Sequence, residues 1–191
     1  PGAMRVISQP GRSRRDTGRI APGSVTPATK DGRSQFRGSL TMRTGLDVLR
    51  DTGFDAIRGR RVGLVCHPAS VDSNLAHAAE LLAAAPGVEL AALFGPEHGF
   101  HGTAQDLIGV GHAQAGALTV HSLYGSTFAS LKPTPEQLRG LDALVIDLQD
   151  VGARYYTFQA TMLYCMEACA ESGVAAVVLD RPNPLGGTDV E

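Results

Sequence analysis

The stretch LDALVIDL, residues 141–148, is the clearest guide to the architecture when it is read together with residues 154–179. It is an almost continuous apolar run of strand length, which is typical of a strand buried on both faces of a parallel sheet. Residues 154–172 then carry one apolar stripe at helical spacing, and Gly173 is placed to end that helix. The run VAAVVL at 174–179 comes next as another buried strand. This strand, helix and strand indicate neighbouring parallel strands joined by a helix.

Further apolar runs of the same kind lie upstream. Residues 61–66 (RVGLVC) and 88–94 (VELAALF) are predicted to be buried strands, and a shorter strand is expected near residues 118–123. Because helical patterns fall between these runs, the sequence predicts an α/β fold, a parallel sheet with helices on both of its faces.

Three shorter helices are predicted between the strands. One begins at Thr44 and is interrupted at Gly53, and another is capped by Asp72 or Ser73. Residues 134–137 read TPEQ, which is a capping residue, a proline at the first helical position and a capping-box glutamine.

Composition separates an amino-terminal tail from the rest of the chain. The chain has 191 residues, of which 43% are hydrophobic, so a packed core is feasible. Residues 1–40 hold eight of the 17 basic side chains but only two of the 19 acidic ones. They are also rich in glycine, proline, serine and threonine, so we predict a disordered basic tail at 1–40 and a folded domain at 41–191.

The same composition argues against several classes of function. The chain beyond residue 40 is acidic and lacks tryptophan, which makes it a poor nucleic-acid binder. No apolar run approaches the ~18 residues of a membrane span. Three cysteines are too few for a disulfide framework. We expect a cytoplasmic location by default, and a periplasmic or secreted one if a leader is missing. The oligomeric state is left open.

Polar side chains come after each strong strand at the point where it ends. The carboxyl ends of parallel strands share one edge of the sheet, and ligands bind beyond that edge, so this recurrence is the main signal of a site. The side chains are His67 after the first run, Glu97, His98 and His101 after the second, Asp147, Gln149, Asp150 and Arg154 after the third, and Asp180, Arg181 and Asn183 after the fourth.

The charged members of this set have both a catalytic and a structural interpretation. Glu97 is a candidate general acid, because a carboxylic acid near apolar surroundings can stay protonated and donate to a leaving oxygen; it can also cap a helix or bind backbone amides. Asp147 and Asp150 can serve catalysis or cap loops. Arg154 and Arg181 can pair with those aspartates or receive a substrate carboxylate.

The remaining polar and aromatic residues allow other chemistries. His98 and His101 have a spacing that can bind a metal on a helix, but they fall in a glycine-rich segment, so no metal is predicted and a metal-dependent hydrolase is an alternative. Tyr156 is either a packing residue or a platform for a sugar ring. The chain contains no G-x-G-x-x-G, P-loop or G-x-S-x-G motif, so no nucleotide cofactor is expected.

Four segments occur in an order that resembles a known family. They are FGPEHG at 94–99, SLYG at 122–125, DLQDVGARYYT at 147–157 and DRPNPLGG at 180–187. Together they resemble the exo-β-N-acetylmuramidase family, formerly a domain of unknown function, and the resemblance covers residues 44–191.

The resemblance implies a Rossmann-like amino-terminal domain that helps to release N-acetylmuramic acid from the non-reducing end of peptidoglycan fragments, without a cofactor. The glutamate of the G-P-E-H-G motif falls on Glu97, which is then the general acid. The second catalytic group is Asp150, Asp147 or the substrate's own acetamido group. Arg154 would bind the lactyl carboxylate. The other implied substrate-binding residues are His98, Gln149, Tyr156, Arg181 and Asn183.

The chain also departs from the family pattern. Residues 66–68 read CHP where Thr-Asn is common, and residues 156–158 read YTF rather than YTY. The family pattern runs on past Glu191, so we expect the carboxy-terminal part of the protein to be missing and the catalytic domain to be truncated. A non-catalytic sugar-binding module, in which Glu97 only anchors a ligand, is the second alternative.

Overall fold

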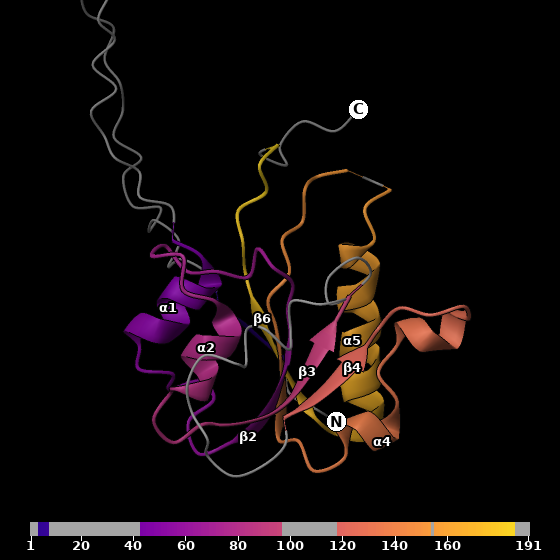
Figure 1. The fold of residues 1–191 in the computed structure, drawn as a ribbon, viewed down its shortest axis with the longest axis horizontal. Coiled ribbons are helices and arrows are strands. Elements are labelled where there is room, and N and C mark those ends of the chain that lie inside the picture. The colour runs from indigo at the N-terminus through magenta and orange to yellow at the C-terminus, as the bar shows by residue number, and fades with distance from the viewer. Residues whose placement is uncertain (1–3, 8–42, 97–117, 154, 186–191) are drawn as a thin grey trace, which may run out of the picture.

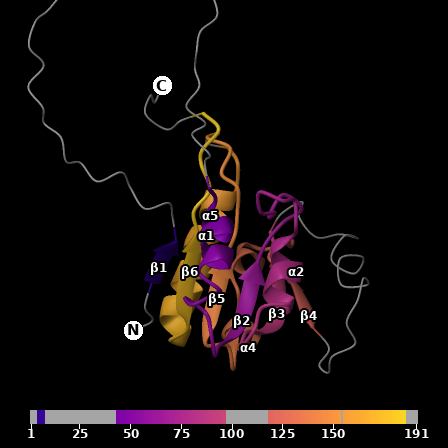
Figure 2. The ribbon, with the colours of Figure 1, turned by 90° about the vertical axis from the view of Figure 1, so that its left-hand side faces the viewer.

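Six parallel strands form one sheet in the computed structural model, which describes residues 4–7, 43–96, 118–153 and 155–185. The strands lie in the order β1-β6-β5-β2-β3-β4, with β1 at one edge and β4 at the other (Figure 2). Their bounds are Met4–Ile7 for β1, Arg61–Val65 for β2, Glu89–Gly95 for β3, Thr119–Ser122 for β4, Ala143–Ile146 for β5 and Ala175–Leu179 for β6.

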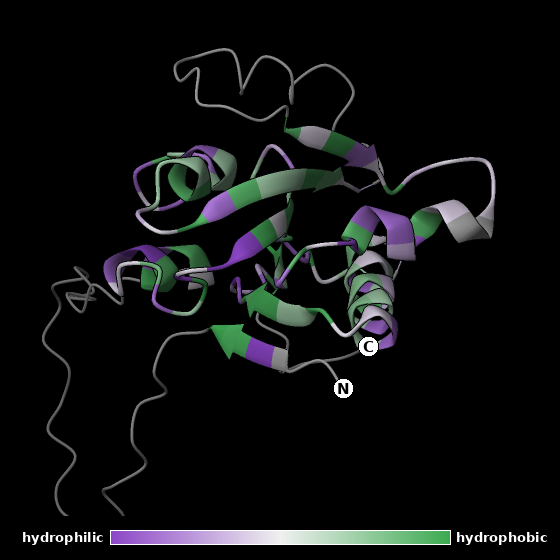
Figure 3. Cartoon of the chain, turned by 90° about the horizontal axis from the view of Figure 1, so that it is seen from below, coloured by the Kyte–Doolittle hydropathy of each residue, from purple (hydrophilic) through white to green (hydrophobic). Residues whose placement is uncertain are grey.

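Helices cover both faces of the sheet (Figure 1). They are α1 (Gly45–Asp51), α2 (Ala78–Ala83), α4 (Pro135–Leu138) and α5 (Phe158–Ser172), with the 3-10 turn η1 at Phe128–Leu131. Side chains of α1 and α2 pack with one face of the strands, and those of α4 and α5 pack with the other. Figure 3 sets these two pairs of helices on either side of the strands, where hydrophobic residues are frequent. The predicted α/β fold is confirmed.

The best helix of the sequence starts later than its pattern suggested. The pattern placed it at residues 154–172, whereas α5 begins at Phe158 after the N-cap residue Thr157. Its end is as predicted, because Gly173 adopts a left-handed conformation with φ 72°. The buried stripe includes Phe158, Cys165 and Cys169, so the helix faces the sheet with the residues that its periodicity selected.

The prediction that Asp72 or Ser73 caps the second helix is wrong. Helix α2 begins at Ala78, and its N-cap is His77, whose Nδ1 accepts a hydrogen bond from the Ala79 amide. Asp72 Oδ1 instead accepts hydrogen bonds from the amides of Asn74 and Ala76. Since these bonds close a local turn around Asp72, the chain there cannot enter a helix.

The predicted disordered tail also needs a correction. Met4–Ile7 forms β1, which pairs in parallel with β6. Ile7 is buried, and its carbonyl accepts a hydrogen bond from the Asp180 amide at 2.9 Å. A run of four residues is too short to predict a strand from sequence, and its partner strand β6 lies far away in the sequence. The rest of the predicted tail, residues 8–42, lies outside the described residues.

No helix among the described residues is long and apolar enough to cross a membrane.

Candidate active site at the carboxyl ends of the strands

The order in which the chain adds strands to the sheet reverses between β2 and β5. From β2 the chain moves through β3 to β4 on one side, and β5 and β6 then lie on the other side of β2. In open parallel sheets, ligands bind in the crevice at such a switch point, beyond the carboxyl ends of the strands. The residues that come directly after β2 and β5 therefore mark the position of a site.

His67 joins the loops that leave β2 and β5. The Gln149 amide donates a hydrogen bond to His67 Nε2 at 3.2 Å. The His67 amide donates to Ser70 Oγ at 3.0 Å, and that hydroxyl donates to the Asp147 carbonyl at 2.6 Å. The residue is 7% exposed, and its imidazole packs against Phe158 in an edge-to-face arrangement, with ring centroids 4.9 Å apart. The hydrogen bond from the Gln149 amide and the bonds through Ser70 Oγ therefore join the loop after β2 to the loop after β5.

The environment of His67 disfavours its protonated form. Burial lowers the pKa of His67 to about 4, and the nearby Arg181 guanidinium and His77 imidazole contribute to the shift. His67 is therefore neutral at pH 7, which agrees with its role as a hydrogen-bond acceptor through Nε2.

Asp147 and Arg181 form a buried ion pair. Arg181 Nε donates to Asp147 Oδ1 at 2.5 Å, and Arg181 Nη2 donates to Asp147 Oδ2 at 2.9 Å and to the Val71 carbonyl at 2.9 Å. The side chains are 0% and 5% exposed. Burial raises the pKa of the Asp147 carboxyl, and the hydrogen bonds from Arg181 oppose that shift. Of the two predicted interpretations of Arg181, the structure contains the pairing with an aspartate.

Asp150 is placed differently from Asp147. It is half-buried, and its Oδ1 accepts a hydrogen bond from the Gly152 amide at 3.1 Å. Its Oδ2 accepts from Asn183 Nδ2 at 3.2 Å. The carboxylate is therefore held in one orientation by two neutral donors, and part of the residue stays in contact with solvent.

Gln149 ties the loop after β5 to the segment after β6. Its Nε2 donates to the Asp150 carbonyl at 2.6 Å and to the Pro182 carbonyl at 3.0 Å. Gly152 lies so close to Asn183 that a Cβ at this glycine would fall 2.7 Å from Asn183 Oδ1. Figures 1 and 2 both show these two segments rising side by side beyond the sheet.

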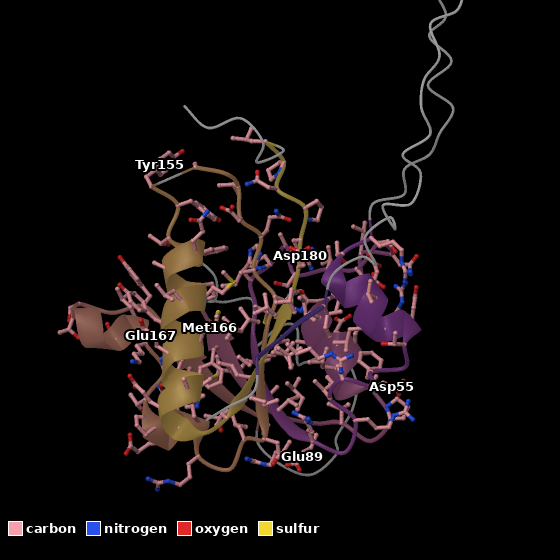
Figure 4. The ribbon with its side chains drawn as sticks, turned by 180° about the vertical axis from the view of Figure 1, so that it is seen from behind. Asp55, Glu89, Tyr155, Met166, Glu167 and Asp180 are labelled. Carbon is pink, nitrogen blue, oxygen red and sulfur yellow. The ribbon has the colours of Figure 1, made fainter. Side chains whose placement is uncertain are left out.

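The aromatic residues of the loop after β5 differ in burial. Tyr155 is 88% exposed and lies at the tip of the loop, far from Glu89 at the opposite end of the sheet (Figure 4). Tyr156 is half-buried and packs against Phe158, with ring centroids 4.6 Å apart. Since Phe158 also contacts His67, these rings form one wall of the site.

Four of the predicted site residues, Glu97, His98, His101 and Arg154, lie outside the described residues. The chain is described up to Pro96, directly after β3. There the Cys66 amide donates to the Phe94 carbonyl at 3.1 Å, so the ends of β2 and β3 lie side by side. The role of Glu97 stays a prediction.

A hollow of about 310 Å³ lies elsewhere, against β3, β4 and α4. Its charged lining is already paired, since Arg61 binds Glu89 and Arg139 binds Glu136. The loops after β2, β5 and β6, in contrast, are joined by hydrogen bonds at the switch point, so we place the site there. Among the described residues, no group of three histidine, cysteine or acidic side chains could hold a metal ion.

Comparison with known proteins identifies the family. A family model described as "Exo-beta-N-acetylmuramidase NamZ, N-terminal" matches residues 62–191. The chain belongs to this family. It is 42% identical over 179 residues to the peptidoglycan beta-N-acetylmuramidase NamZ of Bacillus subtilis strain 168, covering 92% of this chain and 42% of that protein.

Solved structures agree with this assignment. A DUF1343 family protein from Bacteroides fragilis NCTC 9343 is 44% identical with a TM-score of 0.67, over 78% of this chain and 37% of that one. A second DUF1343 family protein of the same organism is 29% identical with a TM-score of 0.56, over 74% of this chain and 35% of that one. The chain thus spans about two fifths of the length of these relatives, and the resemblance seen in the four motifs is confirmed.

Sequence reasoning placed His67 at the correct edge but gave it no role. It missed Ser70 and His77 altogether, although His77 Nε2 lies 3.0 Å from the carbonyl oxygen of His67. The position of His67 could have indicated a role, because His67 lies just past the end of β2, and β2 borders the switch point.

Proposed function

We propose that this chain supplies the catalytic edge of a glycosidase that releases N-acetylmuramic acid from the non-reducing end of peptidoglycan fragments. Membership of the family and the activity for which the Bacillus subtilis relative is named support the substrate class. Because the chain spans 42% of that relative, the activity of a whole enzyme is part of what we propose.

The observation that carries the proposal is the pair of linked loops after β5 and β6. Gln149 and the contact between Asp150 and Asn183 fix them beside the end of β2. The chain leaves β3 at the same edge of the sheet, since β3 is the parallel neighbour of β2, and Glu97 comes two residues after β3 in the sequence. A glycosidase needs two groups that flank the scissile bond, and in our proposal Glu97 and a group of this edge supply them.

Asp150 is the better second catalytic group of the two aspartates. Asp147 is fully buried, and both of its oxygens are occupied by Arg181. Asp150 is half-buried and is oriented by two neutral hydrogen bonds. We therefore assign the general acid to Glu97 and the second role to Asp150, with participation of the substrate's acetamido group as the alternative.

The buried pair also bears on recognition of the substrate carboxylate. Arg181 is buried and donates hydrogen bonds to Asp147 and Val71, so in our proposal it does not bind the external anion. Arg154 therefore takes the lactyl carboxylate in our proposal, while His98, Gln149, Tyr156 and Asn183 line the saccharide site. No cofactor takes part.

The test uses the full-length gene product with a chromogenic β-N-acetylmuramide and the matching glucosaminide. We expect turnover of the muramide only, and the Glu97→Gln variant should lose about 10²–10⁴-fold in kcat because the general acid is removed. Glu89→Gln is the matched control, since Glu89 is an exposed residue at the opposite end of the sheet (Figure 4). A Glu97→Gln enzyme with a near-normal rate would overturn the assignment.

Two further measurements separate the alternatives. Activity that disappears with a chelator and returns with added metal would favour a metal-dependent hydrolase that uses His98 and His101. Saccharide binding by a protein that never turns the muramide over would favour a sugar-binding module.

A further inference from the structure

His67 occupies a position that the proposed chemistry does not by itself require. It lies at the switch point and joins the loop after β2 to the loop that carries Asp150. The link continues, because Gln149 donates to His67 through its backbone amide and to the Pro182 carbonyl through its side chain. His67 and Gln149 together therefore connect the loops that leave β2, β5 and β6.

We propose that His67 is a positioning residue: its Nε2, as acceptor for the Gln149 amide, fixes the β5–α5 loop and thereby the Asp150 carboxylate. The significance of Asp150 rests on the proposed function, whereas the link between His67 and the loop does not. The β5–α5 loop comprises residues 147–157.

Burial, together with the groups that face His67, keeps its imidazole neutral. Arg181, which lies just past β6, is paired with Asp147 at the end of β5. His77, the N-cap of α2, places its Nε2 3.0 Å from the His67 carbonyl, which can only accept a hydrogen bond. The ring also makes an edge-to-face contact with Phe158 at the start of α5.

Only a neutral His67 with its proton on Nδ1 can make this link. Nε2 must offer its lone pair to the Gln149 amide, and a doubly protonated ring has no acceptor. Protonation would set an N–H group against the Gln149 N–H, so the loop would be released. The lowered pKa of His67, about 4, keeps the link intact across the neutral range.

The experiment compares the 191-residue chain with its His67→Gln and His67→Leu variants by ¹H–¹⁵N NMR. Glutamine offers a carbonyl acceptor at a reach similar to that of Nε2 but does not titrate, and leucine offers no acceptor. The readouts are hydrogen exchange at the Gln149 amide and its chemical shift as a function of pH. The Leu144 amide, in the middle of β5, reports on the core.

We expect the Gln149 amide of the unsubstituted chain to titrate with the imidazole of His67, at a midpoint well below the ordinary histidine value. In His67→Leu, exchange at Gln149 should become about tenfold faster, the equivalent of one lost hydrogen bond, while Leu144 stays protected. His67→Gln should restore protection and abolish the titration. His121→Leu is the matched control, since His121 is a partly buried histidine of β4 that contacts Phe94.

Equal protection of Gln149 in the unsubstituted chain and in His67→Leu would overturn the proposal. A chemical shift of the Gln149 amide that does not change as His67 titrates would overturn it too. This measurement uses the unsubstituted chain, so it remains decisive even if His67→Leu does not fold. In the full-length gene product, His67→Leu should lower kcat on the muramide more than it raises KM, and His67→Gln should restore it. An inactive unsubstituted enzyme would refute the proposed function, and the NMR result would still decide the role of His67.

Discussion

At the amino-terminal end of the sheet, Arg61 of β2 pairs with Glu89 of β3, and the two side chains are 43% and 67% exposed. At the carboxyl end, Arg181 pairs with Asp147, and both side chains are buried. The two pairs join the same kinds of group at similar distances, 2.8 Å and 2.5 Å between the closest atoms. Because exposed pairs are screened by water and enclosed charges are not, the carboxyl end should respond far more strongly to substitution.

The largest effect is expected for Arg181→Met. This change leaves the Asp147 carboxylate buried without its partner, so the free energy of unfolding at neutral pH should fall by about 3–5 kcal/mol. Arg61→Met, the matched change at the other end, should cost at most about 1 kcal/mol. Urea unfolding measured by circular dichroism, at constant m-value, gives both values.

The double variant Asp147→Leu/Arg181→Met tests the same contrast from the other direction. Replacing both charges with apolar side chains removes the unpaired carboxylate, so the double variant should be more stable than Arg181→Met alone. Equal losses for Arg61→Met and Arg181→Met would contradict the contrast between the two ends.

The second effect concerns pH. The folded pKa of His67, about 4, lies below its ordinary value of 6.5, so the unfolded chain binds more protons at this residue between these two values. Its contribution to stability is complete above pH ~6.5 and is lost as the pH falls towards ~4, in total about 3 kcal/mol. Unfolding curves of the unsubstituted chain and His67→Gln, taken across this range, isolate the term. A difference between the two that does not change with pH would refute it.

Some parts of the fold could be predicted from the sequence, and others could not. The strands were predictable because an apolar run such as residues 143–146 has to be buried on both faces. The end of α5 was predictable because Gly173 adopts a left-handed conformation that suits glycine. Both are local rules, which need no knowledge of distant residues.

Two of the failures depend on contacts between distant segments or on a competing local turn. β1 exists because β6, which lies near the other end of the chain, offers a free edge. The start of α2 was misplaced because the Asp72 carboxylate binds nearby amides and Arg50.

The candidate site shows the same division. That Asp150 and Asn183 share one edge was implied by the parallel sheet, and the structure brings them into contact. The ion pair between Arg181 and Asp147 could not be predicted from the sequence, which left open whether Arg181 pairs with an aspartate or receives a substrate carboxylate. The catalytic role of Glu97 stays a prediction.

The third effect compares two helix caps and begins at the carboxyl end, where Thr44 caps α1. Its Oγ1 accepts a hydrogen bond from the Asp47 amide and donates one to Asp47 Oδ2 at 2.8 Å. Asp47 is 2% exposed, and although burial favours its neutral form, hydrogen bonds from Ser73 and Thr44 hold its pKa well below the usual range. Thr44→Ala should therefore cost about 2 kcal/mol, the upper end for a cap, because it also removes a donor from a buried carboxylate. Thermal unfolding checks this value, and Thr44→Ser, which keeps the hydroxyl, should lose much less.

The smallest effect is expected for Thr134→Ala, which removes the corresponding cap of α4. Here Thr134 Oγ1 accepts from the Gln137 amide at 3.3 Å, and Gln137 Oε1 accepts from the Thr134 amide at 2.9 Å. Both bonds are exposed, so water replaces them at little cost and the loss should be about 0.5 kcal/mol, the lower end for a cap. The two capping boxes share their geometry and differ in burial, so the difference between Thr44→Ala and Thr134→Ala in one thermal unfolding series isolates the effect of burial. A loss at Thr134 as large as that at Thr44 would show that the burial of Asp47 adds nothing to the cap, and it would contradict the contrast between the two ends.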